Sequence, residues 1–393
     1  MMEVEGSLII RLQTRLAAAN VVSIESSRPL YASRVFIGKD ITESLRLIPL
    51  LFNICATAQS CAAVRACEQA LGQQAAAEIE QKRDLLVNME TLREHLWRIL
   101  LDWPAFIDSE ADSSTLAGIV ALQRAYQQAL SPQSNLFQPD MSESKSNFIE
   151  LNAVADSVAD LLQQSLFSMP VAQWLTITTH KDLVQWVKSS QTIPARLIDQ
   201  IMQAGWSGAG RCDSVALPVM DEAQLHVSMQ HKQYLEQPQW YGECCETSSL
   251  TRTHSPLLES LKQTYGNGLL VRLVARLTEI AQLSEKLLPH EVDSRGEHDA
   301  CDPGVCNPGI GQARAARGEL VHRIALDGKV IQNYQILAPT EWNFHPQGVV
   351  AHALASLQGE SGDVEKQAHL LINAIDPCVG YKLHITQEST TDA

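Results

Sequence analysis

Hydrophobic residues recur at helical spacing through most of the chain. Between residues 74 and 101 apolar side chains follow one another three or four positions apart, and Pro104 would stop the helix that this pattern predicts. The same spacing predicts further helices over 115–130, 147–167, 180–190, 194–205, 255–265 and 269–288, with a loop over 131–146. The middle of the chain is therefore predicted to be a helical bundle.

Two more helices are predicted before this bundle. Asp40 precedes an apolar segment that extends to residue 54, and Glu43 follows three residues later, a pattern typical of a helix N-cap. Pro49 would kink or interrupt this helix. An alanine-rich helix over 56–71 would then end at Gly72. Cys55 lies at the junction, where the N–H groups of a helix N-terminus stabilise a thiolate and lower its pKa.

Period-two patterns predict β-structure at both ends of the chain. Residues 7–16 and 22–25 suggest an antiparallel pair, and two β-capable runs, 320–326 and 330–336, flank an Asp327-Gly328 turn. Helices are expected over 349–357 and 364–375, a tight irregular stretch over 338–343, and loops over 205–210, 241–246 and 289–314. We expect a mainly α protein with small antiparallel β hairpins near both termini (α+β). We treat 1–393 as one interlocked domain, with parts 1–72, 73–288, 289–314 and 315–393.

Composition and charge narrow the function classes. The net charge of -15 leaves no basic excess for nucleic acid or for an anionic membrane surface. Because no run of 18 apolar residues occurs and the first residues lack a signal-peptide pattern, we expect a cytoplasmic protein without membrane insertion. The nine cysteines are scattered and odd in number, so reduced thiols are expected.

An incomplete metal-binding motif lies near the end of the chain. Cys378 follows Pro377 and precedes His384 by six residues, but Tyr381 occupies the position where a second thiolate would belong. A second candidate, Cys301 and Cys306 with His290 and His298 nearby, has irregular spacing, so a zinc or iron-sulfur site and surface loop thiols remain alternatives.

An ordered set of short motifs resembles the large subunit of nickel-iron hydrogenases. The motifs occur in that family's order and at both ends of the chain. They are Glu5-Gly6, Gly38-Lys39-Asp40, Cys55-Ala56-Thr57-Ala58-Gln59, Arg317-Gly318, Asn333-Tyr334-Gln335, Pro339-Thr340-Glu341-Trp342-Asn343, and Asp376-Pro377-Cys378 with His384. The resemblance implies a hydrogenase large-subunit-like helical core.

The departures from that family bear on function. Its enzymes hold nickel and iron with two Cys-x-x-Cys pairs, whereas the matching stretches here begin at Phe52 and end at Tyr381, which leaves only Cys55 and Cys378. Gln59 stands where the family has a histidine, and Ser33 stands where it has a magnesium-binding acid. A four-thiolate nickel site cannot be built from these positions, so we expect no nickel and no hydrogen turnover.

The retained positions indicate a different role. Arg317 and Thr340 match the residues that bind cyanide on the family's iron, and the combined pattern resembles HupK/HoxV-type accessory proteins. The resemblance implies a non-catalytic scaffold that transiently holds iron with cyanide and carbonyl ligands through Cys55 and Cys378. Its expected partners are hydrogenase maturation factors and the hydrogenase large-subunit precursor.

Two further matches and several alternatives accompany this hypothesis. Glu5 corresponds to a proton-relay acid and His384 to a magnesium ligand of the family, but structural roles are favoured for both. The cysteines could instead be small buried hydrophobes, Arg317 a hairpin cap or the partner of an acidic residue, and Thr340 part of the Pro339 turn. At the level of the whole protein, the alternatives are a metal-free interaction protein with an acidic docking surface and, least favoured, an active hydrogenase.

Overall fold

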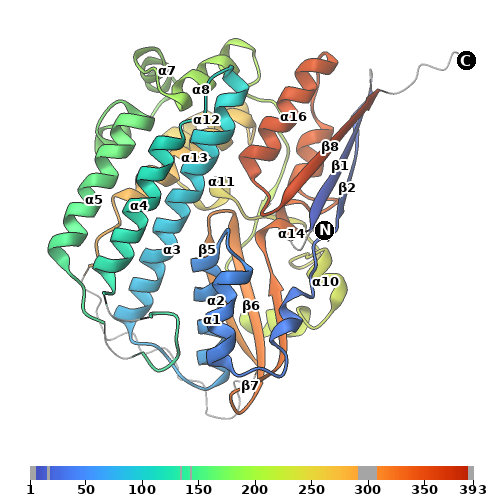
Figure 1. Cartoon of the computed structure of the whole chain (residues 1–393). Coiled ribbons are helices and arrows are strands. Elements are labelled where there is room, and N and C mark those ends of the chain that lie inside the picture. The colour runs from blue at the N-terminus through green and yellow to red at the C-terminus, as the bar shows by residue number, and fades with distance from the viewer. Residues whose placement is uncertain (1–5, 16–17, 133–134, 142–143, 291–307, 388–393) are drawn as a thin grey trace, which may run out of the picture.

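The computed structural model describes residues 6–15, 18–132, 135–141, 144–290 and 308–387. Long helices stand side by side and form one side of the molecule (Figure 1). They are α3 (Ala77–Trp97), α4 (Ser113–Leu130), α5 (Phe148–Leu162) and α13 (Leu269–Ser284). α3 continues into a π-helical turn, η2 (Arg98–Asp102), and α5 into another, η4 (Gln163–Phe167).

Shorter helices surround this group and connect it to the sheets. Two precede α3, namely α1 (Ile41–Leu51) and α2 (Ala56–Ala70), and 3-10 turns lie at η1 (Ala32–Phe36) and η3 (Trp103–Ile107). The others are α6 (Val171–Trp174), α7 (His180–Ser189), α8 (Ile193–Gln203), α9 (Glu222–Ser228), α10 (Lys232–Glu236), α11 (Ser249–Arg252), α12 (Pro256–Tyr265), α14 (Pro339–Asn343), α15 (Val349–Ala355) and α16 (Ser361–Ile375).

Helix α13 is buried along most of its length. Every side chain from Leu269 to Ala281 is buried, including charged ones. A helix that is enclosed on all sides must supply partners for its polar groups. Arg272 does so with Glu246 at 2.6 Å, while Arg276 extends toward the C-terminal end of α16 and donates to the backbone oxygen of Asn373 at 3.1 Å.

Three small sheets complete the fold. One has the order β2-β1-β8, from β1 (Ser7–Thr14), β2 (Val21–Ser26) and β8 (Gly380–Gln387). Another is the meander β5-β6-β7, from β5 (Gly309–Ala315), β6 (Gly318–Asp327) and β7 (Val330–Leu337). Two-residue strands β3 (Val215–Ala216) and β4 (Cys245–Glu246) form the third. The first sheet lies at the edge opposite the long helices (Figure 1).

The meander is held against α2 by an unusually close backbone approach. A Cβ added to Gly309 would lie 2.1 Å from the backbone oxygen of Ala66, and one added to Gly311 would lie 1.9 Å from that of Ala62. Only glycine on the strand and small residues on the helix permit this spacing. The contact fixes α2, and with it Cys55 at its N-terminus, relative to the turn that carries Arg317 between β5 and β6.

The first and last strands of the described chain pair directly. β1 and β8 are parallel, with Ser7 opposite Gly380 and Thr14 opposite Gln387, whereas β1 and β2 are antiparallel. Pairing begins two residues after Cys378. The N-terminal sheet therefore anchors the C-terminal cysteine turn.

Most sequence-based expectations of fold are confirmed. The structure is mainly helical with small sheets, Asp40 caps α1 by accepting from Thr42 N at 2.7 Å, and the Asp327-Gly328 turn joins β6 and β7. Pro49 lies inside α1 without interrupting it. No helix in the described ranges is long and apolar enough to cross a membrane.

The structure differs from the local predictions at several places. Residues 309–314 form strand β5, not a loop, because α2 covers them. Residues 338–343 contain the one-turn helix α14, and α9 and α10 lie in a stretch for which no helix was predicted. The C-terminal strand β8 was not expected, and its pairing with β1 is parallel. Glu43, expected to complete a capping box, forms an ion pair with Lys39 at 2.6 Å.

Candidate functional site

Cys55 occupies the N-cap position of α2, as predicted, but its environment does not favour a thiolate. The first N–H groups of α2 are already used, since Thr57 and Ala58 donate to the Glu90 carboxylate at 2.8 and 3.0 Å. Burial, the neighbouring Cys378 and Glu90 raise the pKa of Cys55 to about 12. The expectation of a lowered pKa is therefore wrong, because the thiol is buried and a carboxylate from α3 already accepts from the first N–H groups of the helix.

A string of buried hydrogen bonds ends at the Cys55 sulfur. Gln59 Nε2 lies 3.6 Å from Cys55 Sγ, and Gln59 Oε1 lies 2.8 Å from His322 Nε2. His322 Nδ1 is 2.7 Å from the Tyr334 hydroxyl. If His322 Nε2 carries the proton that Gln59 accepts, Tyr334 donates to Nδ1 and every donor points toward the sulfur. The string fixes the orientation of the Gln59 amide.

Cys378 is presented by the turn that ends α16. Asp376, the first residue after the helix, has φ +68°, a left-handed backbone that Asn, Asp and Gly adopt most readily. The N–H of Cys378 donates to Thr340 Oγ1 at 3.0 Å. Thr340 on α14 therefore positions Cys378, and its own hydroxyl proton is left to donate elsewhere.

Arg317 enters the same region from the turn between β5 and β6. Its Nη1 donates to Glu94 Oε2 at 3.0 Å, and its Nε lies 3.3 Å from Asp376 Oδ1. Asn343 Nδ2 fixes the backbone by donating to the oxygen of Arg317 at 3.2 Å. Burial opposes the charged form, but the charges of Asp376, Cys378 and Glu94 together raise the pKa of Arg317.

Asp376 gathers three arginines around one buried carboxylate. Arg98 Nε donates to Oδ1 at 2.8 Å, Arg317 Nε lies 3.3 Å from the same oxygen, and Arg276 Nη2 lies 3.7 Å from Oδ2. Burial alone would raise the pKa of Asp376, but these arginines hold it below its usual range. Arg276 Nε and Nη1 have no hydrogen-bond partner within the described ranges. The region beside the thiols is thus rich in buried positive charge.

Four of the predicted site residues come together: Cys55, Cys378, Arg317 and Thr340. The charge of Cys378 contributes to the raised pKa of Cys55, and both thiols contribute to the raised pKa of Arg317. No group of three or more His, Cys, Asp or Glu side chains in the described part of the chain could hold a metal ion. The donor set is therefore two thiols beside hydrogen-bond donors, not a four-thiolate centre.

The other two predicted residues do not join this cluster. Glu5 lies outside the described residues. His384 is exposed on β8 opposite Arg11, and its side chain makes no hydrogen bond to any residue that the structure describes. Ser33, expected opposite His384, instead donates to the Tyr334 backbone oxygen on β7 at 2.7 Å. These contacts therefore give no support to the structural role that was favoured for His384.

Tyr381 does not replace the missing thiolate. Its hydroxyl lies 2.9 Å from His369 Nδ1 on α16, and the ring packs against the main core. The alternation of Tyr381, Leu383 and Ile385 with polar residues directs these three side chains toward the core and His384 toward solvent.

Sequence reasoning missed several residues of the site. Arg28 pairs with Glu341, and Arg98, Arg276 and Glu94 complete the charge network. A signal existed for Arg276, because an arginine within the apolar run of α13 must find a buried anion. Nothing local marks Arg28, which reaches the site only through the tertiary fold.

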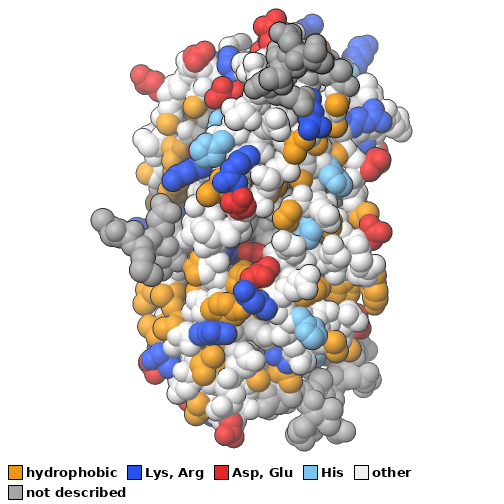
Figure 2. All heavy atoms as spheres, turned by 90° about the vertical axis from the view of Figure 1, so that its right-hand side faces the viewer, with side chains coloured by type: hydrophobic (Ala, Val, Ile, Leu, Met, Phe, Trp, Pro, Cys, Tyr) orange, Lys and Arg blue, Asp and Glu red, His pale blue; other side chains and the backbone are white. Residues whose placement is uncertain are grey.

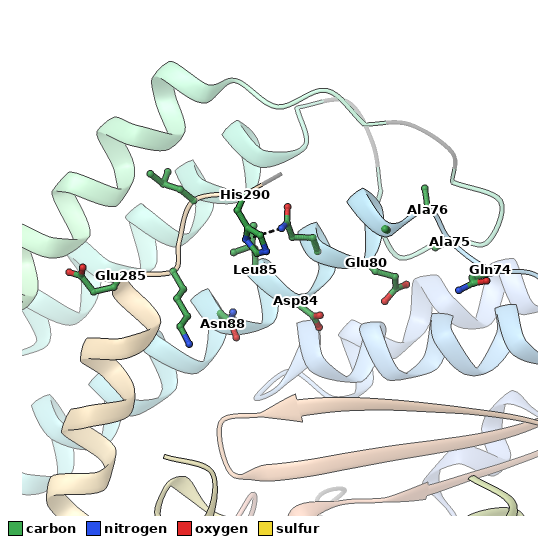
Figure 3. Close-up of a pocket in the computed structure, with 13 residues that line it drawn as sticks. Gln74, Ala75, Ala76, Glu80, Asp84, Leu85, Asn88, Glu285 and His290 are labelled. Carbon is green, nitrogen blue, oxygen red and sulfur yellow. Dashed lines mark hydrogen bonds between the residues drawn. The ribbon is translucent and has the colours of Figure 1, made fainter. Parts of the chain in front are cut away.

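The remaining thiols lie elsewhere. Cys244 Sγ is 3.3 Å from His345 Nδ1, a contact that sequence spacing did not suggest. Cys301, Cys306 and His298 fall outside the described residues, so the alternative metal site at those positions stays a prediction. A cleft of about 960 Å³ lies between the start of α3 and the end of α13, where Gln81 contacts His290 (Figure 3). It contains no cysteine and is separate from the thiol pair.

The molecular face that carries the β2-β1-β8 edge is not uniformly acidic. Figure 2 shows lysine and arginine side chains interspersed with acidic ones over this face. The net charge of -15 is therefore not gathered here.

Comparisons with known proteins agree with the motif resemblance. The sequence is 32% identical to the hydrogenase expression/formation protein HoxV of Cupriavidus necator, over 93% of this chain and 94% of that protein. It is 29% identical to the hydrogenase expression/formation protein HupK of Azotobacter vinelandii, over 97% of this chain and 98% of that protein.

Solved structures show the same fold. The reduced Ni-Fe-Se hydrogenase from D. vulgaris Hildenborough superposes with a TM-score of 0.62 at 16% identity, over 95% of this chain and 98% of that chain. The pattern of the family described as Nickel-dependent hydrogenase matches residues 122–384. Because this match spans more than half of the sequence and includes the arginine turn and the C-terminal cysteine, the chain belongs to the nickel-dependent hydrogenase family.

Proposed function

We propose that this protein is a cytoplasmic, non-catalytic accessory factor in hydrogenase maturation, which holds an iron-cyanide-carbonyl fragment before that fragment passes to the large-subunit precursor. Two relatives that match nearly the whole chain are named hydrogenase expression/formation proteins. The observation that carries the proposal is the convergence of Cys55 and Cys378 with Arg317 and Thr340, from four separate parts of the chain.

The thiols supply the iron ligands in this mechanism. Thiolate sulfur suits a soft iron centre, and each thiol gives up its proton when the metal binds. Two sulfur ligands hold the fragment less firmly than the four of a complete nickel-iron centre. Tyr381 is turned toward His369 and Phe52 replaces the other cysteine, so a nickel ion lacks its remaining thiolates.

The diatomic ligands are held by hydrogen-bond donors. Thr340 accepts from the Cys378 backbone, which leaves its O–H free to donate to a bound cyanide. Arg317 uses Nη1 for Glu94, and its Nη2 makes no hydrogen bond to any described residue. A charge-assisted hydrogen bond of this kind contributes about 1.5–3 kcal/mol. The two donors therefore favour an anionic diatomic ligand over water.

Infrared spectroscopy tests this function directly. Protein purified without oxygen from a cell with the maturation machinery should show stretching bands of metal-bound cyanide and carbonyl. Cys55→Ser and Cys378→Ser should abolish the bands, whereas Cys244→Ser, at a half-buried thiol outside the cluster, should leave them unchanged. Thr340→Val should shift the cyanide bands and leave the carbonyl band nearly in place.

The main alternative is a metal-free interaction protein that docks maturation factors. The raised pKa of Cys55 is compatible with a thiol that stays protonated and metal-free. Preparations that restore hydrogenase assembly but never show cyanide or carbonyl bands would overturn the iron scaffold and favour this alternative. Turnover of hydrogen remains the least favoured function, because two of the four matched thiolate positions carry other residues.

A further inference from the structure

Arg28 is a cationic residue at the outer side of the thiol pair. Gly6, at φ +69°, packs so closely that an added Cβ would lie 2.7 Å from Arg28 Cα, and the N–H of Arg28 donates to Ser26 Oγ at 3.3 Å. These contacts fix the backbone. The side chain is 18% exposed, compared with 4% for Arg317. Arg28 therefore extends from a fixed backbone toward the site while part of it remains in contact with solvent.

The Arg28 side chain reaches the neighbourhood of both cysteines. Its Nη1 donates to Glu341 Oε1, and Glu341 directly follows Thr340, the residue that holds the Cys378 backbone. Burial disfavours the charged form, but Glu341 and the two thiols, Cys378 more than Cys55, raise the pKa of Arg28. Two arginines, the buried Arg317 and the more exposed Arg28, therefore lie in the neighbourhood of the thiol pair.

In the ion pair between Arg28 and Glu341, both side chains keep hydrogen-bonding atoms without a partner among the described residues. Glu341 is 6% exposed, and its Oε2 has no hydrogen-bond partner among the described residues. Among the same residues, the Arg28 side chain makes one hydrogen bond, although a guanidinium has five donors in a planar fork. A single contact of this kind can be exchanged for a bidentate contact with another anion.

We propose that Arg28 is the anion-recognising group at the entrance to the thiol pair, and that Glu341 holds Arg28 when no anion is bound. When an anionic ligand binds, the Arg28 guanidinium exchanges its contact with Glu341 for contacts with the ligand. When the ligand leaves, the ion pair between Arg28 and Glu341 forms again. The natural cargo, an anionic iron-cyanide fragment, rests on the proposed function. Recognition itself depends only on charge and hydrogen-bond donors, so a small anionic probe should also respond to Arg28.

Alkylation with iodoacetate and iodoacetamide tests this inference without metal. In both reactions a cysteine thiolate displaces iodide from carbon, and the reagents differ in carrying a carboxylate or a neutral amide. The folded protein is labelled for a set time, and peptide-resolved mass spectrometry then gives the two alkylation rates at Cys55 and at Cys378. The measured ratio is the rate with iodoacetate divided by the rate with iodoacetamide. Arg28→Gln should lower this ratio roughly tenfold, the effect expected from one nearby unit charge in a partly screened site.

Two further variants separate recognition from a simple change in charge. Glu341→Gln releases Arg28 and should raise the ratio above that of the unmodified protein. The double variant Arg28→Gln/Glu341→Gln restores the charge balance but lacks the guanidinium, so its ratio should stay low. Arg11→Gln, which removes an exposed ion-paired arginine on β1, should change nothing, and Cys244 provides a reference thiol in every sample.

Three results would overturn the inference. The double variant could return to the ratio of the unmodified protein, which would assign the loss in Arg28→Gln to an unpaired Glu341. Glu341→Gln could leave the ratio unchanged, or neither cysteine could react with either reagent, which would mean that no entrance exists on this side. A normal alkylation response without infrared bands would refute the iron cargo alone.

Discussion

Replacing Asp376 with asparagine should destabilise the protein by about 3 kcal/mol. Asn tolerates the left-handed backbone that the structure shows at this position, so the change removes charge without adding strain. Removing one partner of a buried ion pair costs about 3–5 kcal/mol. The lower end applies because Arg98 keeps Asp102 at 2.8 Å and Arg317 keeps Glu94 at 3.0 Å, whereas Arg276 loses the one carboxylate with which it forms an ion pair among the described residues.

Urea unfolding followed by tryptophan fluorescence measures this loss. The side chain of Trp103 donates to Asn373 Oδ1 at 2.9 Å, three residues before Asp376, so the signal includes the region that changes. Asp363→Asn provides the control, because it removes an exposed charge from the first turn of the same helix. Such surface changes stay within about 0.5 kcal/mol.

The pH dependence gives an independent check. Because the folded-state pKa of Asp376 is lowered, its carboxylate contributes stability above its unfolded pKa, about 3.9, and this contribution is lost as pH falls through the folded value. The difference between the unmodified protein and Asp376→Asn should therefore be constant from about pH 5.5 to 8. A loss below about 1 kcal/mol, or a difference that shrinks by pH 6, would refute the assigned charge network.

Two other changes should respond in defined directions. Burial raises the pKa values of Cys61 and Cys67 to about 12, so these thiols lose their protons at lower pH in the unfolded chain than in the folded protein, and stability should fall as pH rises from about 9 toward 12. The double variant Cys61→Ala/Cys67→Ala should show a smaller fall in urea midpoint over this pH range. An unchanged slope would contradict the assignment to these two thiols. His322→Phe should cost about 2–4 kcal/mol at pH 8, because Gln59 and Tyr334 lose their buried partner. Burial lowers the pKa of His322 to about 3, so between pH 8 and pH 5 only the unfolded chain takes up a proton at this position, and the cost should be smaller by about 2 kcal/mol at pH 5. Unfolding measurements that give the same cost at both pH values would contradict the neutral buried imidazole.

The sequence predicted elements whose causes are local. Helical periodicity located the long helices, and the Asp327-Gly328 turn located the second hairpin. The strand β8 was not predicted, although Tyr381, Leu383 and Ile385 alternate with polar residues, because its partner β1 lies at the other end of the described chain. Strand β5 has no such alternation, since its glycines are selected by contact with α2.

The candidate site was predictable only where a family motif marked it. Cys55, Cys378, Arg317 and Thr340 carried such marks, and the structure gathers them. Burial, Cys378 and Glu90 raise the pKa of Cys55 against expectation, and Glu90, which accepts from the N–H groups of Thr57 and Ala58, comes from α3. Arg28, Arg98 and Arg276 likewise enter through tertiary contacts. Patterns along the chain identify candidate ligand residues, whereas the charged residues that shift the pKa values of those ligands are brought near them by tertiary packing.

The parallel pairing of β1 with β8 also sets an order of events during synthesis. The two strands lie at opposite ends of the described chain, and translation at about 5–20 residues per second separates their emergence by roughly 20–70 s. During that interval the edge of β1 that β8 later covers has no strand beside it, which makes it a target for chaperones and for mispairing. Because Cys378 directly precedes β8, the thiol pair can form only after nearly all of the described chain has been synthesised.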